Sequence, residues 1–71
     1  MTETDIEALA KSVEKLAPRT RLARYKELAA EALSQAESSH EQTTRRAYFR
    51  VATAWRALAA DLERDLVRRR A

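Results

Sequence analysis

Hydrophobic residues recur at helical spacing in two long stretches of this chain, and a short polar segment separates them. The apolar positions fall three or four residues apart between residues 22 and 36, and again between residues 48 and 66. Ser38, Ser39 and His40 lie between the two stretches. Helices joined by so short a turn lie antiparallel and face each other. The pattern therefore predicts an all-α protein built on an antiparallel helical hairpin.

Alanine is frequent on both apolar stripes, and small residues allow two helix axes to approach closely. We expect Tyr25, Leu28, Trp55, Leu58 and Leu62 to hold the hairpin together, with the aromatic residues near the edge of the core because their polar tips need partners. The full stripes are Leu22, Tyr25, Leu28, Ala29, Ala32, Leu33 and Ala36 in the first helix and Tyr48, Val51, Ala52, Trp55, Leu58, Ala59, Leu62 and Leu66 in the second.

A third helix is predicted before Pro18, with Ile6, Leu9, Ala10, Val13 and Leu16 on one face. This face points roughly 140° away from that of the following helix at 100° per residue. Pro18 also disfavours helix at the preceding residue, so we expect a break or sharp bend there. The predicted helices cover residues 5–17, 19–37 and 40–70 of one domain, 1–71, and Ser38 or Ser39 is placed to cap the last of them.

The last helix carries more apolar surface than one neighbouring helix covers. Phe49, Ala60 and Val67 lie about 120–140° from the centre of the Trp55 face. The first helix can fold back over this second stripe, which gives a three-helix bundle, or a second chain can cover it, which gives a dimeric helical bundle. We favour self-association because a chain of 71 residues buries only a small core. The predicted interface residues are Ile6, Leu9, Val13, Leu16, Phe49, Ala60 and Val67.

Composition narrows the setting of this helical domain. The chain has no Cys and no Gly, so neither a disulfide nor a Gly-rich phosphate loop is available. No apolar run approaches the roughly 20 residues that a membrane span needs. The N-terminal segment is acidic and lacks the features of a secretory signal. We expect a cytoplasmic protein without a membrane partner.

Charge raises nucleic acid as an alternative partner. The net charge is +3, and no acidic residue lies between Gln42 and Ala60. An Arg-rich face can hold phosphate groups, but no known reading motif is visible. A positive last helical turn is also favoured by the helix dipole alone, so this alternative is not the favoured one. Its basic patch consists of Arg45, Arg46, Arg50, Arg68, Arg69 and Arg70.

Residues that carry catalytic or metal chemistry are sparse. His40 is the only histidine, and one histidine beside Glu41 falls short of the three or four ligands of a metal site. No Ser or Thr has a base at a spacing that indicates activation. We therefore expect no enzymatic activity, no metal and no cofactor.

Three short segments resemble a type of small, Ala-rich bacterial hairpin protein. They are Tyr-Lys-Glu-Leu-Ala at 25–29, the turn Ser-Ser-His-Glu at 38–41, and Trp-Arg-Ala-Leu-Ala at 55–59. The resemblance covers residues 22–63 and implies a helical hairpin without an assigned activity. The sequence thus predicts a small regulatory or adaptor-like protein that acts through protein contact, with itself as a dimer or with another protein.

Overall fold

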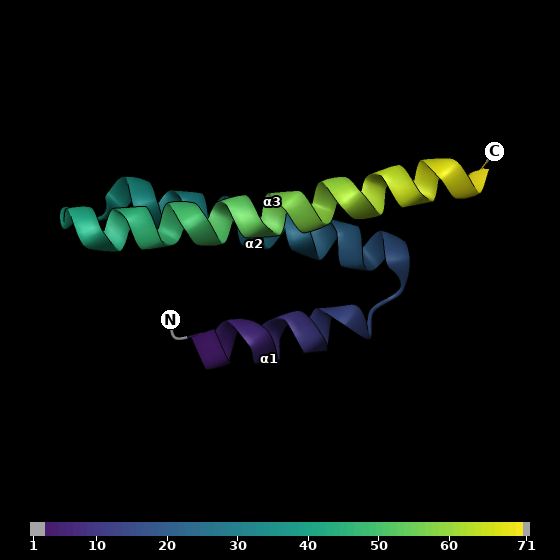
Figure 1. The fold of residues 1–71 in the computed structure, drawn as a ribbon, viewed down its shortest axis with the longest axis horizontal. Helices are drawn as coiled ribbons and strands as arrows, with labels where there is room; N and C mark the ends of the chain where they lie inside the picture. The colour runs from purple at the N-terminus through teal and green to yellow at the C-terminus, as the bar shows by residue number, and fades with distance from the viewer. Residues whose placement is uncertain (1–2, 71) are drawn as a thin grey trace.

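The computed structural model describes residues 3–70, and these form three helices, α1 (Glu3–Glu14), α2 (Pro18–Ser38) and α3 (Gln42–Arg70). No strand occurs among the described residues. The helices α2 and α3 pack side by side as an antiparallel hairpin, and α1 lies along one side of it (Figure 1). The described part is elongated, with extents of 45 × 21 × 13 Å. The predicted all-α hairpin with an added N-terminal helix is confirmed.

The break between the first two helices lies next to Pro18, but α1 ends at Glu14 and not at the predicted residue 17. Pro18 occupies the first turn of α2, and Ala17 before it is extended, with φ −58° and ψ 149°. A residue before proline avoids the α conformation, so the helical pattern cannot continue through Ala17. The amide of Leu16 instead donates to the Val13 carbonyl at 3.0 Å in a tighter final turn.

The turn between α2 and α3 is built mainly from backbone hydrogen bonds. The Ser39 amide donates to the Ala36 carbonyl at 3.4 Å, and the Arg45 amide donates to the Glu41 carbonyl at 3.0 Å. The Ser39 hydroxyl donates to the Glu41 carbonyl and caps no amide of α3. The helix α3 therefore begins at Gln42, two residues later than predicted, and the predicted serine cap is wrong.

The core between α2 and α3 consists of alanines around one aromatic pair. Tyr25 and Trp55 are buried and stack with ring centroids 5.9 Å apart. Neither polar tip has a hydrogen-bond partner, yet neither is among the buried unpaired atoms of the described residues, so both tips reach water. The alanines buried along the two helices are Ala29, Ala32, Ala36, Ala52 and Ala59.

The helix α1 packs within its own chain, against the side of the hairpin where the aromatic pair lies. Val13 is only 3% exposed and belongs to the same core cluster as Tyr25, Leu28 and Trp55. Ile6 and Leu9 are half-buried against that cluster. Of the two alternatives for covering Phe49 and Val67, the one in which the first helix folds over them does not occur. Ile6, Leu9 and Val13, predicted as interface residues, pack within the chain instead. Leu16 lies in the linker after α1 and stays exposed.

Candidate interaction surface

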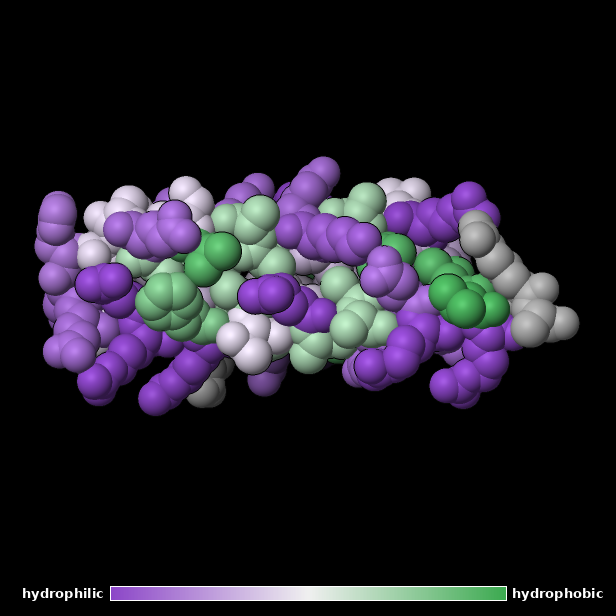
Figure 2. All heavy atoms as spheres, turned by 90° about the horizontal axis from the view of Figure 1, so that it is seen from above, coloured by the Kyte–Doolittle hydropathy of each residue, from purple (hydrophilic) through white to green (hydrophobic). Residues whose placement is uncertain are grey.

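The side of the hairpin turned away from α1 has no cover from the described part of the chain. We call it the open face and define it by Ala30 and Leu33 of α2 and by Phe49, Ala60 and Val67 of α3. Phe49 is 40% exposed and Val67 63% exposed. Figure 2 looks onto this side and shows hydrophobic areas along the molecule with charged side chains between them. The apolar stripe of Phe49, Ala60 and Val67 predicted from the sequence is thus left uncovered.

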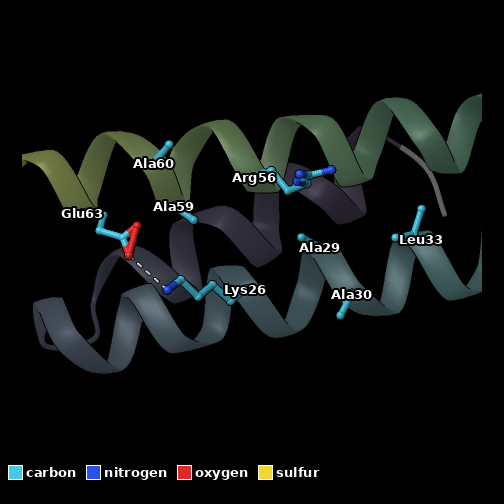
Figure 3. Close-up of a pocket in the computed structure, with 8 residues that line it drawn as sticks. All are labelled: Lys26, Ala29, Ala30, Leu33, Arg56, Ala59, Ala60 and Glu63. Carbon is cyan, nitrogen blue, oxygen red and sulfur yellow. Dashed lines mark hydrogen bonds and ion pairs between the residues drawn. The ribbon is translucent and has the colours of Figure 1, made fainter.

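A shallow groove of about 460 Å³ runs between α2 and α3 in the middle of the open face. Ala29 and Ala59 point into the seam between the helices at different levels along it, while Ala30 and Ala60 point away from the seam (Figure 3). Because these side chains are single methyl groups, the groove leaves room for a long side chain from another molecule. Leu33 lies toward one end of it.

Three charged side chains line the groove. At the end away from Leu33, the Lys26 ammonium pairs with the Glu63 carboxylate at 3.1 Å (Figure 3). Both side chains are more than half exposed, so this pair adds little to stability. Arg56 also lines the groove and holds no ion pair within the described residues. The groove therefore combines an apolar floor with an exposed carboxylate, which is paired with Lys26, and a guanidinium without an ion pair in the described residues.

Thr53 lies between Phe49 and Arg56 on α3 and adds no unmet polar group to this surface. Its hydroxyl donates to the Phe49 carbonyl at 2.9 Å. A hydroxyl that is satisfied inside its own helix does not need a partner from another molecule. The position is therefore compatible with contact by a second helix.

Two leucines that the sequence pattern places inside the hairpin, Leu33 and Leu58, lie at its rims in the structure. Leu33 is 36% exposed and belongs to the open face, while Leu58 is 40% exposed and faces α1. Each lies about 90° from the centre of the buried residues on its helix at 100° per residue. Leu58 therefore does not hold α2 and α3 together as predicted. It borders a hollow of about 210 Å³ between α1 and α3, together with Ile6 and Ala10.

The predicted basic patch is divided between the two ends of α3. Arg45 and Arg68 are 23 residues apart in one helix, which is about 35 Å at 1.5 Å per residue. The three arginines near the start of α3 are exposed and hold no ion pair with any residue that the structure describes, whereas Arg69 near its end pairs with Asp65 at 3.2 Å. The structure does not join the two groups, which are Arg45, Arg46 and Arg50 at one end and Arg68, Arg69 and Arg70 at the other.

The end of α3 meets the start of α2, as the antiparallel hairpin implies. Arg21 lines one hollow there with Arg68 and Arg69, but Asp61 and Asp65 line it too. An ion pair also links Asp61 to Arg64. This end therefore carries mixed charge and not a purely basic surface.

Neither a metal site nor a membrane span is found in the described residues. No group of three or more His, Asp or Glu side chains is placed to hold a metal ion in residues 3–70. None of the three helices that the structure describes is long and apolar enough to cross a membrane. His40 is exposed in the turn between α2 and α3.

Comparison with known proteins returns no relative. No protein-family model, no curated protein and no solved structure matches this chain. The resemblance to small bacterial hairpin proteins therefore stays a prediction that rests on the sequence pattern.

Proposed function

We propose that this protein acts through protein–protein contact as a small regulatory or adaptor-like protein, and that a second copy of the chain occupies its open face. The observation that carries the proposal is the uncovered apolar surface of α3. Phe49 and Val67 remain well exposed although α1 is folded against the same hairpin. Large apolar side chains exposed on one side of a small domain, with an alanine-lined groove between them, are typical of an interaction site.

The total accessible surface supports a partner of substantial size. The chain exposes 5509 Å², whereas a compact monomer of 8.1 kDa exposes about 4,500 Å². The excess of about 1,000 Å² is similar to the ~800 Å² that each partner buries in a standard interface. The elongated shape of the hairpin creates this excess, and pairing along the open face removes it.

The composition of the core favours self-association over a monomer. Among the residues whose burial the structure describes, nine are buried; five of these are alanines, and the larger ones are Tyr25, Leu28, Trp55 and Val13. Burying a further Phe or Val side chain is worth roughly 1.5–3 kcal/mol, which is a large gain for a domain of this length. A dimer provides that burial without any other molecule.

Replacing Phe49 by glutamate tests this proposal directly. We expect light scattering to give twice the chain mass of 8.1 kDa for the intact protein and the single chain mass for Phe49→Glu, because a carboxylate at a buried interface loses its water. Ala47→Glu is the matched control, since Ala47 is exposed and lies about 160° from Phe49 around α3. It should remain a dimer. An intact chain that stays monomeric up to millimolar concentration contradicts the proposal.

Binding of nucleic acid is the second candidate function, supported by the acid-free first half of α3. Arg45, Arg46, Arg50 and Arg56 are exposed there and hold no ion pair within the described residues. They are spread over about 140° of the helix circumference. This spread is wider than one line of phosphates requires, which is why protein contact is the first candidate.

Salt dependence separates the two functions. If four arginines contact phosphates, the affinity for a DNA duplex falls on the order of 100-fold between 50 and 200 mM salt. We expect the affinity of the dimer to fall much less over the same range, because its contacts are mostly apolar and salt screens only its few ion pairs. Fluorescence anisotropy with a labelled duplex and light scattering in the same buffers measure the two affinities. Steep salt dependence of duplex binding that Arg46→Ala reduces would favour the nucleic-acid function.

A further inference from the structure

The open face carries a regular seam along α3. Its positions are spaced four, three, four, three and four residues apart, and this is the repeat by which two helices pack along their lengths. The helix is continuous over all of them. We call this set the outer seam, and its members are Phe49, Thr53, Arg56, Ala60, Glu63 and Val67.

The outer seam is self-complementary when it is reversed. Its large apolar residues, Phe49 and Val67, lie at the two ends, 18 residues apart, or about 27 Å along the helix. Reversing a second helix about the midpoint brings Phe49 opposite Val67 of the second copy. The same operation brings Arg56 opposite Ala60 of the second copy, where the groove is open.

Charge selects the antiparallel direction over the parallel one. A parallel pairing in register places Arg56 opposite Arg56 and Glu63 opposite Glu63, and like charges in an interface are unfavourable. In the antiparallel pairing, Arg56 lies within one helical turn of Glu63 of the second copy. Arg56 is unpaired within the described residues. The Glu63 carboxylate is paired with Lys26 through Oε1, but its side chain is 54% exposed, so a second cation can reach it.

We propose that two copies pair antiparallel along the outer seam, so that the Arg56 stem of each copy fills the alanine-lined groove of the other and its guanidinium meets Glu63. Phe49 then packs against Val67 of the second copy at both ends of the interface. This arrangement rests on the proposed function, because it specifies how the second copy occupies the open face. It uses the room that the single methyl groups of Ala59 and Ala60 leave.

Disulfide trapping tests the direction of pairing, and the absence of native cysteine gives each variant a single thiol. Phe49→Cys and Val67→Cys are mixed, one of them carrying a tag, and are oxidised mildly. We expect the linked species to be the mixed dimer, with little linking of Val67→Cys to itself. Efficient self-linking of Val67→Cys overturns the antiparallel direction. Light scattering on the untreated protein separates this outcome from failure of the proposed function, which gives a monomer.

Charge exchange tests the contact between Arg56 and Glu63. We expect Arg56→Glu alone to weaken the dimer at least about tenfold, and Arg56→Glu combined with Glu63→Arg to restore most of the affinity. Circular dichroism confirms that each variant is folded. Arg45→Glu is the control, since Arg45 is exposed and lies outside the outer seam. A double variant that is as weak as Arg56→Glu alone overturns this contact.

Discussion

Replacing Trp55 by alanine is expected to lower the free energy of unfolding by about 3–5 kcal/mol. The side chain is 3% exposed and stacks on Tyr25 with ring centroids 5.9 Å apart. It belongs to the cluster in which all three helices meet. Its loss leaves a cavity that alanine neighbours cannot fill. Because domains of this length are marginally stable, we expect the variant to be largely unfolded at 37 °C.

Thermal unfolding followed by far-UV circular dichroism measures this effect without relying on the deleted fluorophore. Leu16→Ala is the matched control, because it also shortens a large side chain but at a position in the linker that is 38% exposed. We expect its cost to stay below about 1 kcal/mol. An unchanged melting curve for Trp55→Ala would show that the aromatic pair does not organise the core.

Replacing Val13 by aspartate is expected to detach α1 from the hairpin. Val13 is the one residue of α1 that is fully buried in the described structure, at 3% exposure. It belongs to the core cluster that also contains Tyr25, Leu28 and Trp55, so a carboxylate there is removed from water. We expect a loss of about 3 kcal/mol, which is typical of an unsatisfied polar group in a core. The aspartate also lies near the C-terminus of α1, where negative charge is unfavourable.

The fluorescence of the single tryptophan reports on this change, because Trp55 and Val13 belong to the same core cluster. Detachment of α1 should shift its emission to longer wavelength while α2 and α3 keep most of the helical signal. Ser12→Asp places the same charge one residue earlier, at an exposed position, and should change stability by less than about 0.5 kcal/mol. Equal effects of Val13→Asp and Ser12→Asp would contradict the docking of α1 described here.

The hairpin could be predicted from the sequence because two long apolar stripes and one short turn leave few alternatives. The side of the hairpin against which α1 packs could not be predicted. Ile6, Leu9 and Val13 form a stripe that suits any apolar surface, and the hairpin offers one on each side. The structure places them in and against the cluster that contains Tyr25 and Trp55, and no pattern within the first helix distinguishes that side from the stripe of Phe49, Ala60 and Val67.

Only part of the open face could be predicted from the sequence. Periodicity identified Phe49, Ala60 and Val67, because they lie far from the Trp55 face on one helix. Periodicity missed Leu33 and the exposed carboxylate of Glu63, since the place of these two residues in one groove depends on how α2 and α3 are aligned. The pair of Lys26 and Glu63 reveals that alignment, and no pattern within a single helix contains it.

The alanines buried between α2 and α3 limit which substitutions the core tolerates. At Ala36, which is 0% exposed, a larger side chain would push the helix axes apart at about 1–3 kcal/mol. Glycine would fit the space but costs about 1 kcal/mol in helix propensity. Both a larger side chain and glycine are therefore destabilising at the five buried alanines, Ala29, Ala32, Ala36, Ala52 and Ala59. The positions that carry the smallest side chains of the core should accept the narrowest range of amino acids in a saturation mutagenesis experiment.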